Sequence, residues 1–393
     1  MTPNARYAAA IEILNRILDG EPAEKILTNW ARSNRYAGSK DRAAVRDIVF
    51  DCLRQKRSLM HIAGFKGARG LIVGHILAAG QTVADVFTGE RFAAEVLTDV
   101  EQTALETDKT AASDAVRLDV PDWIVVKLQT SLGDRFETSL SALQTRAPLD
   151  LRVNPKKADF AQVQSALAQD GIETHSISQV PNALRVTTNP RRVALSEAYK
   201  NGLVEIQDAG SQAVVDALPL EGVETVLDYC AGGGGKSLAI AARADVRIDA
   251  YDQNTGRMRD LSMRAKRAGA IVHILQDDPV LSAKLYDLVL LDVPCSGTGA
   301  WRRNPDGKWR FNATDLQALI GLQAQIITSA QRLVKPGGLL VYITCSLLED
   351  ENEAQLSGFL KQHSGWQSSH CKRLYPSDGT DGFYVAILSK LQL

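Results

Sequence analysis

The stretch that decides the fold is LDYCAGGGGKS, residues 227–237. A short apolar run leads into it, four glycines follow, and Lys236 and Ser237 open a run with helical character. A strand that ends in a glycine turn and continues into a helix is the βα unit with which open α/β sheets hold a ligand.

The same strand–loop–helix rhythm continues to the end of the chain. Strand-like segments at 225–230, 247–252, 271–275, 286–295 and 338–346 alternate with helix-like segments at 236–244, 255–269 and 314–334. Alternation of this kind predicts an α/β fold with a doubly wound, mostly parallel, Rossmann-like sheet.

The glycine turn fits two common phosphate-binding motifs poorly. A P-loop needs glycine at position 230, which is Cys230, and a dinucleotide fingerprint needs glycine at position 237, which is Ser237. The methyl-donor version of the fold needs an acid at the end of the first strand, and Asp228 supplies it. Glycines at 232, 233 and 234 would let the backbone approach that donor closely.

Acidic residues end the next three strands as well. Asp252 could accept both ribose hydroxyls, Asp277 or Asp278 would lie near an adenine edge, and Asp292 follows the fourth strand. Because ligands bind at the carboxyl ends of such strands, these acids predict a cationic cofactor, S-adenosylmethionine.

Two cysteines stand at neighbouring strand ends, Cys295 in DVPCSGTG and Cys345 in YITCS. A thiolate that adds to carbon 6 of a cytosine makes carbon 5 nucleophilic enough to take a methyl group. The second thiol could assist release, and Asp292 could stabilise the adduct. Cys52 and Cys230 are interpreted more simply as buried apolar groups. No cysteine has zinc-ligand spacing, so no metal is expected.

Bulk composition sets the class of protein. The 393 residues are 45% hydrophobic, carry a formal net charge of −1 and contain no membrane-length apolar run. We therefore expect a soluble, cytoplasmic monomer that holds any nucleic acid through local patches rather than a global basic field.

The pattern of predicted helices and strands divides the chain into three predicted domains. Residues 1–140 look all-helical, and basic side chains such as Arg42 and Arg46 lie off the apolar face of the segment 39–62. These side chains form either a solvated surface or an RNA-phosphate contact surface. Residues 141–215 look like a small α+β module, and residues 216–393 carry the alternating pattern.

A cationic, aromatic segment, WRRNPDGKWR, lies between the two cysteines. Arg302, Arg303 and Lys308 could contact RNA phosphates or lower the pKa of a thiol, and the flanking tryptophans could stack bases. The alternative interpretation is a solvated surface loop.

The combination of LDYCAGGGGKS, DVPCSGTGAWRRNPDGKW, LVKPGGLLVYITCSLLEDENE and DGFYVAIL resembles the Sun (Fmu) family of RNA cytosine-5 methyltransferases, in the domain order of the RsmB type. The resemblance covers essentially the whole chain. It implies a NusB-like RNA-binding domain at 1–140, an RRM-like module at 141–215 and a methyltransferase domain at 216–393, acting on 16S ribosomal RNA.

The resemblance also implies residue roles. Cys345 would be the nucleophile and Cys295 would promote product release. Contacts to RNA would come from Arg152 and Asn154 besides the cationic segment. The cofactor would be bound by Asp228, Cys230, Ala231, Gly232, Gly233, Gly234, Gly235, Lys236, Asp252, Asp277 and Asp292. Where the family usually has Ala-Pro-Gly-Gly before the lysine, this chain has four glycines, which loosens the unbound loop.

Other function classes remain open on the sequence. NusB-like helices would also suit a non-catalytic RNA-binding or antitermination factor. A nicotinamide oxidoreductase and a protein methyltransferase use related folds, and titration with NADH or transfer of labelled methyl to protein would reveal them.

Overall fold

The computed structural model describes residues 1–282 and 284–391, and the chain in it forms two compact units. Unit 1 consists of Met1–Arg146 together with Trp301–Asn312, and unit 2 of Ala147–Ala300 together with Ala313–Leu393. The small α+β module and the large sheet thus share unit 2. The division into three domains stays a prediction.

Unit 1 is built from helices, as the sequence predicts. The segment 39–62 is broken in two at Gln55, whose φ of −114° and ψ of 34° lie outside the helical region. The α-helices are α1 (Pro3–Leu18), α2 (Ala23–Ser33), α3 (Ser39–Arg54), α4 (Lys56–Ala63), α5 (Gly67–Ala78), α6 (Asp99–Glu106), α7 (Asp114–Arg117), α8 (Val125–Leu132), α9 (Phe136–Leu143) and α15 (Pro305–Arg310).

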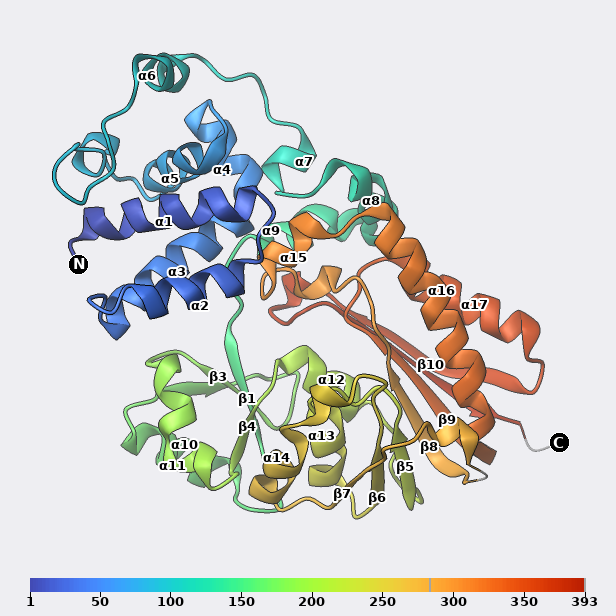
Figure 1. Cartoon of the computed structure of the whole chain (residues 1–393). Helices are drawn as coiled ribbons and strands as arrows, with labels where there is room; N and C mark the ends of the chain where they lie inside the picture. Colours follow the sequence, from blue (N-terminus) through green and yellow to red (C-terminus); the bar gives the residue numbers. More distant parts are fainter. Residues whose placement is uncertain (283, 392–393) are drawn as a thin grey trace. The chain divides into compact units, whose positions relative to one another are not determined.

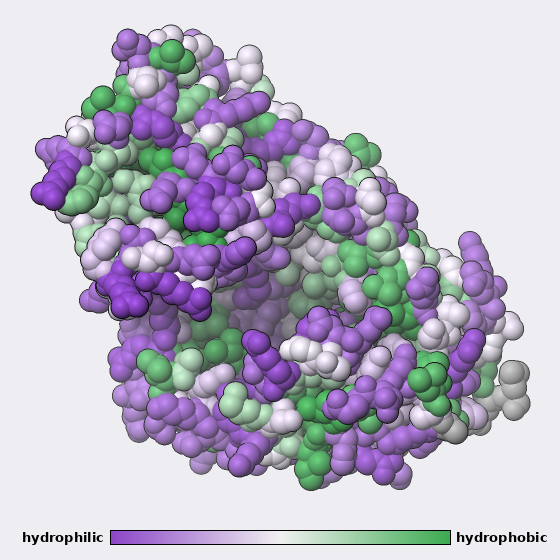
Figure 2. Space-filling model, viewed as in Figure 1, coloured by the Kyte–Doolittle hydropathy of each residue, from purple (hydrophilic) through white to green (hydrophobic). Residues whose placement is uncertain are grey.

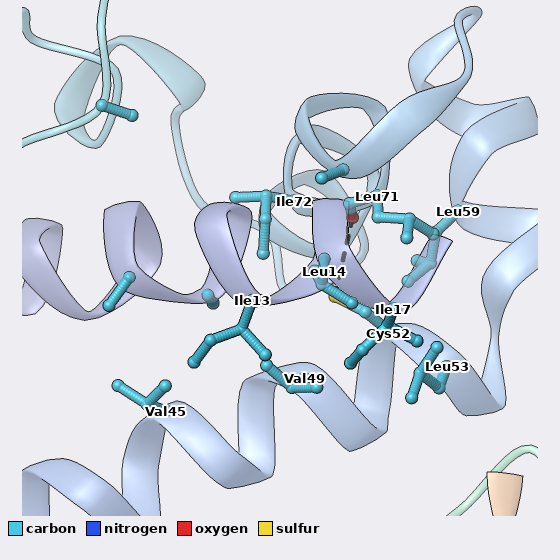
Figure 3. Close-up of a cluster of buried hydrophobic side chains, with 14 of the residues drawn as sticks. Ile13, Leu14, Ile17, Val45, Val49, Cys52, Leu53, Leu59, Leu71 and Ile72 are labelled. Atoms are coloured by element: carbon cyan, nitrogen blue, oxygen red, sulfur yellow. Dashed lines mark hydrogen bonds between the residues drawn. The ribbon is translucent and has the colours of Figure 1, made fainter. Parts of the chain in front are cut away.

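The core of unit 1 lies where α1, α3, α4 and α5 meet (Figure 3). Ile13 of α1 points at Val49 of α3, Leu14 and Ile17 of α1 lie towards Cys52, and all four are buried. Cys52 is fully buried among them, and its thiol lies 3.9 Å from the carbonyl oxygen of Leu71. The interpretation of Cys52 as a buried apolar group is therefore confirmed.

The small module in unit 2 is an antiparallel sheet in the order β2-β3-β1-β4. Its apolar face packs on α10, whose Val163 and Leu167 are buried. The elements are β1 (Leu149–Val153), α10 (Phe160–Gln169), β2 (Thr174–Ser176), β3 (Ala183–Val186), α11 (Glu197–Lys200) and β4 (Val204–Ile206).

The large sheet has the order β10-β11-β9-β8-β5-β6-β7 within the described residues, and its β9-to-β7 part is parallel (Figure 1). The doubly wound fold is therefore confirmed, with an antiparallel pair, β10 and β11, added at one edge. Its strands are β5 (Thr225–Asp228), β6 (Arg247–Ala250), β7 (Val272–Ile274), β8 (Tyr286–Asp292), β9 (Val334–Thr344), β10 (Trp366–Leu374) and β11 (Phe383–Lys390).

Helices cover both faces of this sheet. Side chains alternate along each strand, so Leu227 and Tyr342 lie in one buried layer while Val226 and Ile343 lie in the other. The first layer packs on α16 (Ala313–Ala330) and α17 (Glu353–Gln362), and the second on α12 (Ala209–Asp216) and α13 (Gly235–Arg243). The carboxyl ends of β5, β6, β8 and β9 consequently meet at one edge.

The outer surface is mainly hydrophilic on the face shown in Figure 2, with apolar side chains scattered among polar ones. Within the residues that the structure describes, we find no helix with the length and hydropathy needed to cross a bilayer.

Candidate active site

The glycine turn joins β5 to α13 and is shaped by two residues with left-handed backbone, Gly232 (φ +52°) and Gly234 (φ +76°). Gly234 is the N-cap of α13. A Cβ atom there would come within 2.1 Å of the Leu261 Cδ1 atom of α14 (Leu261–Ala268). Both the positive φ and this close approach require glycine.

Two acids from adjacent strand ends hold the turn. Asp228 accepts a hydrogen bond from Ser237 Oγ at 2.6 Å, and Asp252 accepts one from the Gly232 N–H at 2.9 Å. Arg257 forms an ion pair with Asp252 at 3.1 Å. The second oxygen of Asp228 is buried and finds no donor among the described residues, and burial raises the pKa of Asp228 to about 7.

A cavity of about 220 Å³ opens beside the turn, within unit 2. Its wall combines aromatic rings, carboxylates and aliphatic side chains, including Tyr229, Cys230, Tyr251, Asp252, Asp278 and Ile326. Of the residues predicted to bind the cofactor, Cys230 and Asp252 line it directly. Asp228 lies beneath the turn, only 1% exposed, where it supports the loop.

Of the two acids that follow the third strand, Asp278 lies at the cavity and Asp277 does not. The carboxylate of Asp278 lines the cavity and accepts the Tyr229 hydroxyl at 3.0 Å. Asp277 is solvent-exposed and is not part of the cavity wall. The contact of Asp277 with the cofactor stays a prediction, and Asp278 is the alternative that the cavity wall supports.

Lys236 and Asp292 are brought together, with the ammonium 2.6 Å from a carboxylate oxygen. Lys236 is buried and its ammonium also lies 5.4 Å from the centre of the Phe383 ring. Burial lowers the pKa of Lys236, but the negative charges of Asp292 and Cys345 outweigh it, and the pKa lies above its usual value. A permanent positive charge is thus fixed at the edge of the sheet.

The two cysteines converge as the sequence predicts. Strands β8 and β9 are parallel neighbours, and the Cys295 and Cys345 sulfurs lie 3.4 Å apart as free, partly exposed thiols. The hydrogen bond to Cys345, together with burial, holds the pKa of the Cys295 thiol well above its ordinary value. Pro294, directly before Cys295, lines the cavity. The thiol pair and the cavity are therefore neighbours.

One residue of this site was missed from the sequence, the buried carboxylate of Glu351. It accepts the Ser296 N–H at 2.8 Å, the Gln323 amide at 2.9 Å and the hydroxyls of Ser296 and Ser346. The two serines directly follow the two cysteines, so one carboxylate ties both cysteine loops together. The motif LLEDENE contains this residue, but its four acids lie within five positions, and the sequence pattern gives no means of choosing among them.

Comparison with known proteins gives the family. The family model for 16S rRNA methyltransferase RsmB/F matches residues 215–389, and that for the RsmF/B-like ferredoxin-like domain matches residues 120–193. The ribosomal RNA small subunit methyltransferase B of Vibrio cholerae is 32% identical over 303 residues, 74% of this chain and 69% of the relative. The chain belongs to the RsmB/F family.

Further relatives agree with this assignment. The small subunit methyltransferase B of Yersinia enterocolitica is 29% identical across 99% of both chains. A solved methyltransferase homologue from Pyrococcus horikoshii, 25% identical, covers 70% of this chain and 97% of its own, with a TM-score of 0.62. As a member of the RsmB/F family, the protein is an S-adenosylmethionine-dependent methyltransferase of small-subunit ribosomal RNA.

The RNA-binding prediction for the segment 301–310 needs correction. Arg302 and Lys308 are each only 4% exposed, and Lys308 donates to the Arg54 carbonyl oxygen at 2.9 Å. Burial lowers the pKa of Lys308 to about 7. Both side chains are buried inside unit 1, where they cannot contact an RNA phosphate. Arg303 is exposed, and its contact with RNA stays a prediction.

The prediction for Arg152 and Asn154 is wrong for a similar reason. Both are buried in unit 2, where Arg152 donates to the Gly235 carbonyl oxygen at 2.9 Å and Asn154 donates to the Ala268 carbonyl oxygen at 2.8 Å. Each bond runs from the small module to a helix of the methyltransferase sheet. These two side chains hold the small module against α13 and α14, beside the glycine turn, and are at most 8% exposed.

Unit 1 offers a different basic surface. A cavity of about 670 Å³ between α2 and α3 is lined by the guanidinium-bearing side chains of Arg32, Arg35, Arg42 and Arg46. Trp30 forms part of its wall, and no acidic side chain is among the described lining residues. Arg42 and Arg46 are two of the side chains that the sequence placed on a possible RNA-phosphate surface.

Proposed function

We propose that this protein transfers a methyl group to carbon 5 of a cytosine in 16S ribosomal RNA through a covalent cysteine adduct. The observation that carries the proposal is the pair of thiols, Cys295 and Cys345, 3.4 Å apart beside a fixed ammonium and a carboxylate-lined cavity. Two thiols at one position suit chemistry in which one sulfur adds to a ring and must later leave it.

The residues present fit the cofactor of the family. Asp252 and Asp278 offer carboxylate oxygens to hydroxyl and amine groups, and apolar atoms of Ile326 suit a flat ring. The glycine backbone at 232–234 lets a ligand approach the turn closely, and Asp228 supports that turn from beneath. S-adenosylmethionine supplies an electrophilic methyl group there.

The protein's own groups then perform the remaining steps. The Cys345 thiolate adds to carbon 6 of the cytosine, and the electron pair of the 5,6 double bond makes carbon 5 nucleophilic. Carbon 5 takes the methyl group, loses its proton to a base, and the bond between sulfur and carbon 6 breaks, which returns the thiolate. The Lys236 ammonium interacts electrostatically with Cys345, and the Cys295 thiol lies 3.4 Å from the Cys345 sulfur, near enough to assist release of the product.

We further propose that the arginine-lined cavity of unit 1 holds RNA phosphates. Arg46 is paired with Glu24, but the guanidinium groups of Arg32, Arg35 and Arg42 also line the concavity and attract a polyanion, and Arg side chains can bind phosphate oxygens through two hydrogen bonds. Tyr36, 72% exposed and next to Arg35, could stack on a base. We propose this surface as the RNA-binding site instead of the buried residues Arg152, Asn154, Arg302 and Lys308.

The test is transfer of labelled methyl from S-adenosylmethionine to 16S ribosomal RNA, with bisulfite mapping of the product. Cys345→Ala should lower the rate by at least about a thousandfold. Cys295→Ala should instead accumulate a protein–RNA adduct that survives denaturation. Cys371→Ala, a change of the exposed cysteine, is the matched control and should react normally. Full activity in Cys345→Ala, or label in protein instead of RNA, would refute the proposal.

A further inference from the structure

The carboxylate of Glu351 stands out because it is wholly buried without a cationic partner. Its exposed fraction is 0%, and no ion pair involves it within the described part of the chain. Four donors surround its two oxygens, from Ser296, Ser346 and Gln323. Burying a carboxylate costs free energy that hydrogen bonds offset only in part. We therefore expect the Glu351 carboxylate to have a function that explains this cost.

Geometry gives the first part of the explanation. Ser296 follows Cys295 at the end of β8, and Ser346 follows Cys345 at the end of β9. Both serine hydroxyls bind the same oxygen of Glu351 and lie 3.2 Å from each other. The carboxylate therefore fixes the separation of the two loops and, with it, the distance between the two sulfurs.

Charge gives the second part. The hydrogen bond to Cys345 and burial are the main causes that raise the pKa of Cys295, and the negative charge of Glu351 adds to them. Lys236 interacts with Cys345, so the nearest charged neighbours of the two thiols have opposite signs. The remaining titratable groups that face this cluster are Asp292, paired with Lys236, the buried acid Asp228, and Tyr342, whose hydroxyl donates to the Glu351 carbonyl oxygen.

We propose that Glu351 is a positioning residue that holds the two cysteine loops together and, through its buried carboxylate beside Cys295, makes Cys345 the more reactive of the two thiols. The inference deepens the proposed function and rests on it for its role in turnover. Its physical content, an order of reactivity between two thiols, does not need RNA or a methyl donor.

The experiment measures that order in the full-length protein. Folded protein is alkylated with iodoacetamide across a pH series without RNA, and each cysteine is quantified by peptide mass spectrometry. In the unaltered protein Cys345 should react first. Glu351→Gln removes the charge at nearly constant size and should raise the Cys295-to-Cys345 rate ratio at least about tenfold. Glu349→Gln, an exposed acid two residues away, should leave the ratio unchanged.

Two further variants keep the proposal testable if Glu351→Gln does not fold. Glu351→Asp retains the charge and should retain the order of reactivity. Ser296→Ala retains the charge but loses one loop contact, and should lower kcat for methyl transfer several-fold with the KM for S-adenosylmethionine unchanged. A ratio within twofold of the unaltered protein in folded Glu351→Gln, a reversed order in Glu351→Asp, or an unchanged kcat in Ser296→Ala would overturn the proposal. If the proposed function itself were wrong, the unaltered protein would fail to methylate cytosine while the alkylation order still held.

Discussion

Replacement of Asp228 by asparagine should stabilise unit 2 increasingly as pH rises. Burial raises the pKa of this carboxyl from 3.8 to about 7 in the folded state. An acid with a raised folded pKa favours folding while it is protonated, and this contribution is lost as pH rises from the unfolded pKa through the folded one. Between about pH 5.5 and about pH 8 the unaltered protein should therefore lose about 2 kcal/mol that Asp228→Asn does not lose.

The assay is amide hydrogen exchange of β5 peptides in the absence of cofactor, which reports the opening of unit 2 without the helices of unit 1. The free-energy difference between variant and unaltered protein is compared at the two pH values, so that any constant cost of the asparagine amide cancels. Asp245→Asn, at a 97% exposed side chain of the same unit, is the control and should show no pH trend in this range. A difference for Asp228→Asn that stays constant within about 0.5 kcal/mol would refute the reasoning.

Three other changes test separate parts of the site. Gly234→Ala should destabilise unit 2 by about 2–4 kcal/mol, from the positive φ and the contact with α14, and a melting curve that matches the unaltered protein would contradict this. Asp278→Asn should weaken S-adenosylmethionine binding about tenfold in isothermal titration, while Asp277→Asn should not; equal effects would remove the preference for the second acid. Arg35→Glu should weaken binding of a 16S ribosomal RNA fragment about tenfold at low salt and flatten its salt dependence, whereas Arg16→Glu, an equal charge change outside the cavity, should not; the reverse result would place the RNA elsewhere.

The parts of this protein that the sequence predicts well are those set by strand periodicity. Apolar runs that end in Asp228, Asp252 and Asp292 are sufficient to predict a parallel sheet with its ligand edge. Because β8 and β9 are parallel neighbours, the convergence of Cys295 and Cys345 follows from topology alone. The ligand edge of the sheet and the convergence of the two cysteines can both be predicted without knowledge of loop packing.

The errors concern polar side chains whose surroundings come from distant segments. A sequence window around Arg152 cannot show that the Gly235 carbonyl oxygen will meet it, and one around Lys308 cannot show the carbonyl of Arg54. Basic residues are exposed so often that the default expectation was a surface role. Glu351 is the converse case, an acid in an acidic run that alone turns inward.

The segment Trp301–Asn312 has a consequence for how the chain is made. Lys308 and Trp309 bind the carbonyl oxygens of Arg54 and Leu53, residues 254 and 256 positions earlier. These are the last carbonyls of α3, which have no partner within the helix. During synthesis residues 1–146 leave the ribosome well before the segment 301–312. The last carbonyls of α3 therefore stay exposed to water until Lys308 and Trp309 have been translated. By then strands β5 to β8 of the large sheet have also been made.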